Sequence, residues 1–296
     1  MSVIKKILLI TVLQIFLFVN VAFAKDDVVF LAMHNNYWQV WLMDANGKNA
    51  RAITDSPYDK SRLSWYSNGD LLVCGNQGEL VRLSLLDKSE TPVKLPFKYV
   101  SDAVISPDDK YLAFSQKPKG SIYNKLWLLN VDSGEKTKIH WSAEGFQHEP
   151  VFSLDGDKLY FLSGNNDQNH DVMQYNLRTK KVKPVTFSGL YNLDVAVNNK
   201  NQLLFSSNRK GHYDIWLQDD KQIKQLTDNA ALDGRPSWSV DNQRVYFESN
   251  RSGVMNIWSV DVDAKAEPVQ LTHHKIGARY PLWKHKQAGA VSNAQE

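Results

Sequence analysis

Short stretches of alternating apolar and polar residues follow one another along most of the chain, separated by turns rich in Asp, Asn and Gly. This alternation has the period of a β-strand with one buried and one wet face. After residue 24 no segment shows a convincing apolar period of 3.6 residues, so we expect no long amphipathic helix. The 9 Trp, 12 Tyr and 12 Phe agree with many half-buried strands, because aromatic side chains suit a pleated surface.

A repeat of 40 to 47 residues organises this pattern. Each unit begins with two strands joined by a polar turn, and six first strands end on one apolar position: Trp65, Ile105, Phe152, Val197, Trp238 and Trp283. A third strand follows, and a short fourth strand often ends in Thr, as at Thr54, Thr186, Thr227 and Thr272. Four strands within this length are typical of one blade of a β-propeller.

The two ends of the repeat array complement each other. The array begins with three strands, at residues 28–33, 39–43 and 50–54, and it ends with a lone first strand at residues 279–283. Pairing the last strand with these three completes a sixth blade and leaves no open inner edge. The sequence therefore predicts an all-β, six-bladed β-propeller that is closed by its C-terminal strand.

The first 24 residues differ from the rest of the chain. Lys5 and Lys6 precede an uncharged apolar run that ends in Ala22-Phe23-Ala24, the pattern of a secretory signal peptide cleaved before Lys25. An uncleaved membrane anchor is the alternative, because residues 7–24 are only borderline in length for a span. We expect a signal peptide at 1–24, a propeller at 25–284, a disordered tail at 285–296 and a periplasmic protein without a membrane span after cleavage.

The overall charge limits the partners. Lys and Arg number 35 against 32 Asp and Glu, so the formal charge is only +3 and we expect no nucleic-acid binding. The single cysteine, Cys74, excludes a disulfide within the chain, so stability must come from core burial.

Two segments carry a resemblance to a known family. They are RPSWSVDNQRVYFESNRSGVMNIWSVD at 235–261 and LLFSSNRKGHYDIWL at 203–217, and they combine a Ser-Asn-Arg turn with an aliphatic-Trp strand. With these motifs and the terminal Leu-Thr, residues 28–283 resemble the propeller domain of the TolB family. The resemblance implies a periplasmic, non-catalytic role in the bacterial envelope. We expect this chain to lack the α/β domain that precedes the propeller in TolB, so contacts of that domain are not carried over.

Catalytic motifs are scarce. The sequence has no G-x-S-x-G, H-E-x-x-H, G-x-x-x-x-G-K or C-x-x-C, which excludes a propeller peptidase with its own hydrolase domain. The eight His do not recur at one repeat position, and we interpret them as solvated loop residues. The alternative function is a carbohydrate-binding protein or a metal-dependent polysaccharide lyase, whose imidazoles would converge on one ion. We expect no cofactor, and a divalent cation at the channel mouth remains open.

The start of each first strand carries the most informative residues. Three positions before the repeated apolar residue stand Arg62, Asp102, Glu149, Asp194, Arg235 and Tyr280. A common register places them around one mouth of the central channel, since first strands are innermost in a propeller. The acids and arginines could neutralise each other, or the acids could attract a cation or a partner's Lys or Arg.

Aromatic residues surround this mouth in the adjoining loops. The predicted rim consists of Tyr58, Tyr99, Phe146, Tyr191 and Tyr213. Aromatic side chains with a polar handle are frequent anchors of binding surfaces. We therefore expect a monomeric scaffold that binds a protein partner of the cell envelope at this face.

Overall fold

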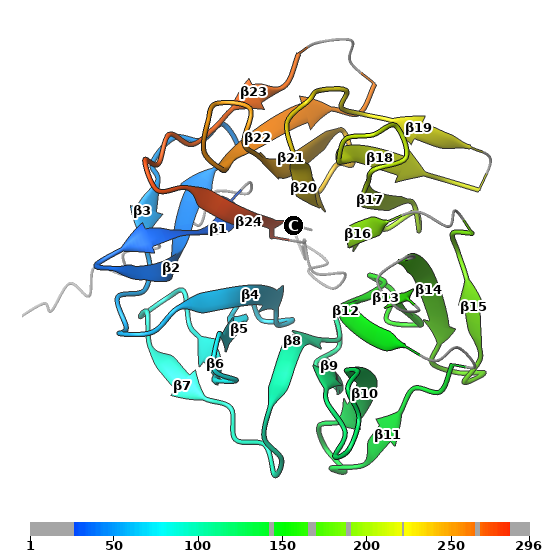
Figure 1. The fold of residues 1–296 in the computed structure, drawn as a ribbon. Coiled ribbons are helices and arrows are strands. Elements are labelled where there is room, and N and C mark those ends of the chain that lie inside the picture. The colour runs from blue at the N-terminus through cyan, green and yellow to red at the C-terminus, as the bar shows by residue number, and fades with distance from the viewer. Residues whose placement is uncertain are drawn as a thin grey trace, which may run out of the picture.

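The computed structural model describes residues 27–141, 145–164, 170–187, 191–220, 222–263 and 267–284. The predicted signal peptide and tail lie outside these ranges. The described residues form 24 β-strands and no helix, in six four-stranded sheets around a common axis (Figure 1). No helix in this described part could therefore cross a membrane. The predicted fold class is confirmed.

Each sheet is one blade, and its strands are named in order from the inner to the outer edge. Blade 1 contains β4 (Lys60–Trp65), β5 (Leu71–Gly75), β6 (Leu80–Leu83) and β7 (Glu90–Pro92). Blade 2 contains β8 (Val100–Ile105), β9 (Tyr111–Gln116), β10 (Lys125–Asn130) and β11 (Lys136–Lys138). Blade 3 contains β12 (Phe146–Phe152), β13 (Lys158–Gly164), β14 (Asp171–Asn176) and β15 (Val182–Pro184).

The remaining blades complete the circle. Blade 4 contains β16 (Asn192–Val197), β17 (Leu203–Ser207), β18 (Asp214–Gln218) and β19 (Ile223–Gln225). Blade 5 contains β20 (Asp233–Trp238), β21 (Arg244–Ser249), β22 (Asn256–Asp261) and β23 (Val269–Gln270). The closing blade contains β24 (Ala278–Trp283), β1 (Asp27–His34), β2 (Tyr37–Asp44) and β3 (Arg51–Ala52).

The ring closes between the two ends of the chain. Strand β24 pairs antiparallel with β1, with Trp283 opposite Val28 and Ala278 opposite Ala32. Each inner strand contacts the next one around the axis, and β24 contacts β4. The Trp65 indole also donates a hydrogen bond of 2.8 Å to the Trp283 carbonyl across this junction. The predicted closure by the C-terminal strand is present in the structure.

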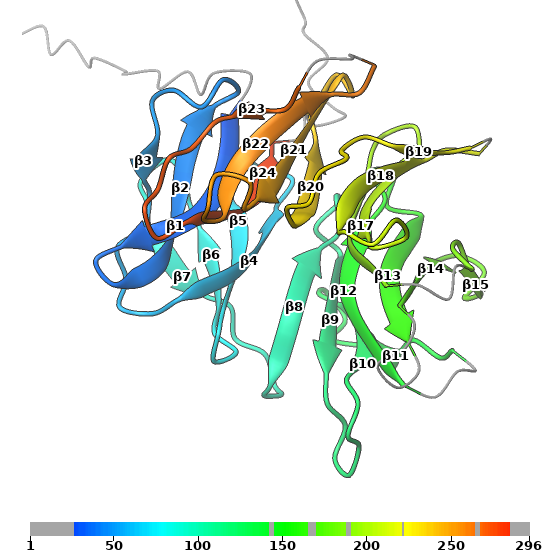
Figure 2. The same cartoon turned by 45° about the horizontal axis from the view of Figure 1, so that its top comes forward.

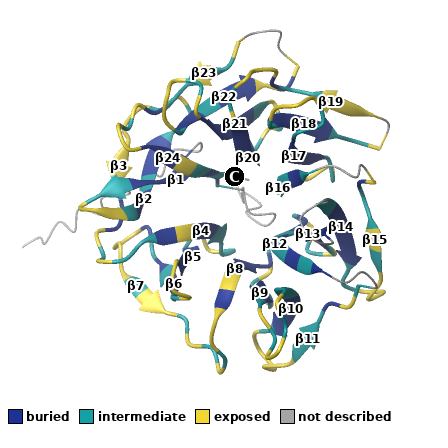
Figure 3. Ribbon diagram, viewed as in Figure 1, coloured by how far each residue is buried: buried dark blue, intermediate teal, exposed yellow. Residues whose placement is uncertain are grey.

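The hydrophobic core is divided into six clusters, each between two adjacent blades. In β5, Leu71 and Val73 pack toward the closing blade, whereas Leu72 and Cys74 pack toward blade 2. The second and third strands of the blades are mostly buried, as Figure 3 shows. A central strand therefore needs apolar residues on both faces. Burial raises the pKa of the Cys74 thiol to about 12, so it stays protonated as a core residue.

The terminal Thr of four repeats fastens the outer strand to the third strand. The Thr272 Oγ1 atom accepts the Ile257 amide at 2.8 Å and donates to Asn256 Oδ1 at 2.9 Å. Thr54, Thr186 and Thr227 accept the corresponding amides at 2.9 to 3.0 Å. This repeated buried contact gives the Leu-Thr motif a structural reason.

The Ser-Asn-Arg turn and the aliphatic-Trp strand form one structural unit. In blade 5, the Arg251 guanidinium lies 5.1 Å from the Trp258 ring and donates to Asp233 Oδ2 at 2.6 Å. In blade 4, the Arg209 guanidinium lies 4.7 Å from the Trp216 ring. The Arg covers the Trp face and ties the turn to its blade, which explains why these residues occur together.

Candidate functional site at the channel mouth

Two sets of loops meet on one face of the ring, which we call the mouth face. They are the connections from one blade to the next and the connections between second and third strands, since Val100 at the start of β8 pairs with Gln116 at the end of β9. In the described part, eleven large apolar side chains are strongly exposed. Seven belong to this face: Tyr37, Tyr99, Ile122, Phe187, Leu232, Val254 and Ile276. The mouth face is thus the more apolar one.

The predicted mouth residues occupy a bulge at the start of the inner strands. The pairing of inner and second strands is irregular at this point in all six blades. Five of the six residues have a left-handed backbone, with φ between 47° and 58°: Asp102, Glu149, Asp194, Arg235 and Tyr280. Such φ values are costly for side chains other than Gly, so surrounding contacts must hold them.

Arg62 departs from this pattern. In blade 1 the irregular pairing lies between Lys60 and Arg62, one residue earlier than in the other blades, and Arg62 has no left-handed backbone. Its guanidinium donates to the Pro150 carbonyl of blade 3 at 2.7 Å and lies 5.8 Å from the Tyr280 ring. Arg62 is buried and reaches past blade 2, so it fills part of the channel.

Arg235 is the centre of the acidic cluster. Its guanidinium lies 3.5 Å from Asp194, 3.9 Å from Glu149 and 3.8 Å from Glu248. Burial lowers the pKa of Arg235, but the attraction of Asp194, Glu149 and Glu248 outweighs it and raises the pKa overall. Burial raises the pKa of Asp194 and Glu248, and Arg235 opposes this shift. One cation is therefore shared by three carboxylates.

The same carboxylates fasten adjacent blades through the backbone. The Asp194 amide donates to Glu149 Oε2 at 3.2 Å, and the Arg235 amide donates to Asp194 Oδ2 at 3.2 Å. The Tyr280 amide donates to Glu248 Oε2 at 3.0 Å. Each bond binds the bulge of one inner strand to a side chain of the preceding blade. These acids have a structural role besides any role in binding.

Of the four carboxylates at the mouth, Asp102 is the one without such a contact. Within the described residues its side chain has no hydrogen bond and no ion pair within 4 Å. It acts on Arg62 at longer range: burial lowers the pKa of that guanidinium, and Tyr280, Asp102 and Glu149 together raise it. Arg62 and Arg235 lie among four carboxylates here, and the exposed Arg279 also attracts Glu248, which leaves a formal charge of −1 when all are ionised. The mouth therefore attracts cationic groups.

Two histidines lie in this site. The His148 and His170 rings are 5.7 Å apart, and Phe146 contacts both of them. His170 also lies 5.0 Å from the Tyr191 ring. Burial lowers the pKa of His148, which favours the neutral imidazole. These two histidines are partly buried in an aromatic cluster with two rim residues, unlike the solvated loop residues that the sequence predicted.

The other rim residues have different environments. Tyr99 is 81% exposed, and Tyr213 is partly buried. The Tyr58 hydroxyl donates to Glu90 Oε2 at 2.5 Å, and the buried Lys60 ammonium lies over the Tyr58 ring. Burial, followed by the hydrogen bond to Glu90, raises the pKa of Tyr58. Tyr58 is therefore fixed in a polar cluster beside blade 1, whereas Tyr99 is available for contact.

Sequence reasoning missed Glu248. It faces Gly234 across the β20–β21 pair, where blades 2 and 4 have Ser115 and Ser206 on the second strand. A Cβ atom on Gly234 would lie 3.1 Å from Asp194 Oδ2, so this glycine leaves room for the carboxylates. The acid at a position that is Ser in blades 2 and 4 was the signal that could have revealed it.

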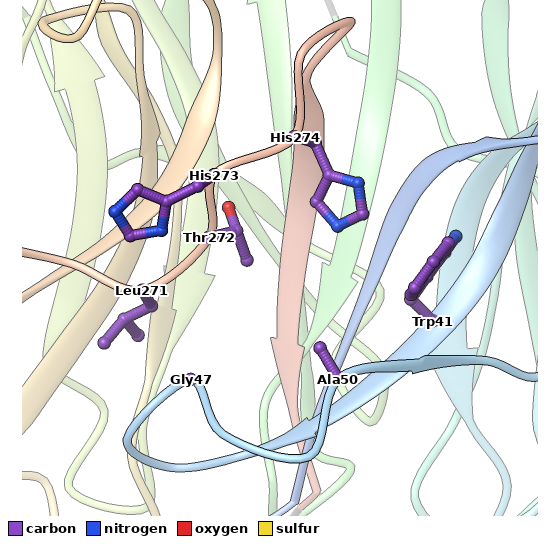
Figure 4. Close-up of a pocket in the computed structure, with 7 residues that line it drawn as sticks. All are labelled: Trp41, Gly47, Ala50, Leu271, Thr272, His273 and His274. Carbon is purple, nitrogen blue, oxygen red and sulfur yellow. The ribbon is translucent and has the colours of Figure 1, made fainter.

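Possible metal ligands and pockets were the other candidates for a functional site. In the stretches that the structure describes, no three His, Cys, Asp or Glu side chains are placed to hold a metal ion. A shallow pocket of about 290 Å³ lies apart from the mouth, between the closing blade and blade 5 (Figure 4). His274 packs edge-on against Trp41 there at 4.8 Å, and burial lowers the pKa of His274. The pocket contains none of the predicted site residues.

Comparison with known proteins places this fold. No known family model matches the chain. An uncharacterized protein of Agrobacterium fabrum is 26% identical over 237 residues, which are 79% of this chain and 65% of that protein. The Tol-Pal system protein TolB of Francisella tularensis is 26% identical over 153 residues, 50% of this chain and 34% of the relative. The chain thus spans less than two thirds of the length of these relatives.

A solved TolB structure has a similar fold. The crystal structure of TolB from Acinetobacter baumannii superposes with a TM-score of 0.77 at 16% identity, over 88% of this chain and 67% of that one. At this identity the likeness shows a shared fold. Together with the six blades, it shows that the chain is a six-bladed β-propeller similar in fold to that of TolB.

Proposed function

We propose that the protein is an exported, non-catalytic scaffold that binds a protein partner of the bacterial cell envelope at the channel mouth. The observation that carries this proposal is the excess of carboxylates at the mouth, where Asp102 has no hydrogen bond or ion pair within the described residues. A Lys or Arg side chain of a partner would neutralise that excess. The resemblance to TolB, a Tol-Pal system protein, supports the envelope setting.

The surroundings of the mouth support contact with a protein. Exposed apolar side chains gather on the mouth face around the acidic centre, and this combination of anchors and charge is typical of protein interfaces. The acidic centre would speed association, whereas the aromatic side chains would slow dissociation. A monomer is sufficient for this role, because one ring forms the whole site.

Site-specific crosslinking in intact cells tests this proposal. A photoreactive amino acid placed at Tyr213, on the mouth face, should give a discrete protein adduct. The matched control is Leu86, which is 79% exposed in the β6–β7 connection on the opposite face. Asp102→Asn should lower the adduct yield from Tyr213 and weaken the dependence of that yield on ionic strength, since it removes a carboxylate charge that has no ion pair of its own.

Two results would contradict the proposal. One is the same adduct with equal yield from Leu86. The other is a Tyr213 adduct that is insensitive to Asp102→Asn while the variant melts like the natural protein.

A further inference from the structure

Two connections of blade 2 form a basic projection on the mouth face, which we call the prong. It consists of residues 93–99, between β7 and β8, and residues 117–124, between β9 and β10. Both project from the lower edge of the molecule in Figure 2. Neither segment contains Asp or Glu, whereas exposed lysines occur in both: Lys94, Lys98, Lys117 and Lys119. The prong is therefore strongly basic in a chain whose total charge is nearly balanced.

The first prong segment is held by its alternate side chains. Val93, Leu95 and Phe97 pack against the core between blades 1 and 2. The Phe97 ring stacks on Phe114 at 5.1 Å with an interplanar angle of 19°. This alternation turns Lys94 and Lys98 outward, so that the positive charges are presented from a supported loop.

The second prong segment is an ordered turn joined to the first. The Ser121 amide donates to the Pro118 carbonyl at 3.0 Å, and Gly120 supplies a positive φ of 79°. The Gln116 side chain donates to the Lys98 carbonyl at 2.6 Å, which connects the two loops. The lysines therefore belong to one preorganised surface.

The prong also exposes large apolar side chains. Tyr99 is 81% exposed and Ile122 is 75% exposed. Within the described residues, none of the four exposed prong lysines forms an ion pair. Lysines around an exposed aromatic and an aliphatic side chain are the composition of surfaces that enter the headgroup region of a membrane.

We propose that the prong docks the protein on the surface of an anionic phospholipid bilayer. Tyr99 and Ile122 enter the boundary between headgroups and acyl chains, and the lysines contact lipid phosphates. An acidic protein is the less favoured occupant, because lysine is depleted in protein interfaces whereas lysine beside apolar tips suits lipid. This docking goes beyond the partner site at the mouth. It shares Tyr99 and Ile122 with the exposed apolar side chains of the mouth face, whereas its four lysines belong to the prong alone.

Vesicle sedimentation tests the proposal directly. The mature protein should bind vesicles that contain phosphatidylglycerol and should bind phosphatidylcholine vesicles weakly, with a loss of binding at high salt. Lys98→Gln with Lys119→Gln should lower the partition coefficient about 25-fold, since one lysine near an anionic surface contributes about fivefold. Adding Ile122→Ser should lower the partition coefficient further without altering its dependence on salt.

Matched variants on the opposite face keep the test specific. Lys88→Gln with Lys180→Gln removes the same charge from the β6–β7 and β14–β15 connections, and Leu86→Ser matches the exposure of Ile122. These controls should bind vesicles within about twofold of the natural protein. Equal losses in prong and control variants would overturn the proposal. Binding of polyglutamate without binding of phosphatidylglycerol vesicles would overturn it in favour of an acidic protein.

Discussion

Arg235 contacts Asp194 twice, once through its backbone and once through its side chain. The Arg235 amide donates to Asp194 Oδ2 at 3.2 Å, and its guanidinium lies 3.5 Å from Oδ1. One carboxylate thus holds the left-handed bulge of blade 5 and is also neutralised by the residue in that bulge. Charge and backbone geometry at the mouth depend on each other, which makes Arg235 the best point at which to perturb both.

Arg235→Gln should destabilise the fold. The variant leaves Asp194, Glu149 and Glu248 without their shared cation, and we expect a loss of about 2 kcal/mol, since the partly exposed guanidinium counts for less than a fully buried one. Arg244→Gln is the matched control, because Arg244 pairs with the exposed Asp261 at 3.0 Å. That control should lose less than about 1 kcal/mol in urea unfolding. Equal losses would argue against a shared cluster.

The destabilisation by Arg235→Gln should depend on pH. Burial raises the pKa of Asp194 and Glu248 in the folded protein, so above the ordinary carboxyl pKa of about 4 the folded state binds more protons than the unfolded state. These groups therefore lose their stabilising effect as pH rises through the folded pKa. Removing the cation enlarges this shift, so the loss should be greater at pH 7.5 than at pH 5. A loss that grows toward pH 5 would contradict this assignment.

Thr272→Val should weaken the seam between β22 and β23. The valine keeps the shape of the side chain but leaves the buried Ile257 amide without its acceptor, at a cost of about 1–3 kcal/mol. Thr272→Ser retains the hydroxyl and should lose less than half as much. Denaturant unfolding of both variants measures the difference. If Thr272→Ser loses as much stability as Thr272→Val, the methyl packing contributes as much as the hydrogen bond, which would contradict this prediction.

Truncation after Leu271 should open the ring. It removes β24, including Trp283, which is 3% exposed and stacks on Tyr246 at 5.0 Å. Loss of that side chain alone costs about 3–5 kcal/mol, which corresponds to a fall in Tm of about 10 °C. The comparison is a chain that ends after His285. A difference within one degree would show that closure contributes little to stability.

Export should remove the first 24 residues. The intact mass of protein from the periplasmic fraction should correspond to a chain that begins at Lys25, because Ala22-Phe23-Ala24 fits the cleavage site. A full-length species that resists a carbonate wash of the membranes would instead support the anchor.

The repeat predicted the architecture because each strand is determined by local patterns. A period near 45 residues, alternation within strands and the unmatched strand at 279–283 together predicted six blades and the closing pair of β24 with β1. The register also predicted which residues gather at the mouth, since equivalent positions of a repeat reach equivalent depths. Arg235, Asp194 and Glu149 are in contact, as the common register predicted.

The chemistry at the mouth was decided by tertiary structure. Arg62 left the common register because the bulge of blade 1 lies one residue earlier, and it reached Pro150 two blades away. Glu248 entered the cluster from a second strand, opposite Gly234, where a Cβ atom would crowd Asp194 Oδ2 at 3.1 Å. By itself, the sequence determined where the strands lie, which face of each strand is buried and in which order the blades follow. These features depend on neighbours along the chain. Which charges are compensated depends on contacts between blades about 45 residues apart, and only the closed ring establishes those distances.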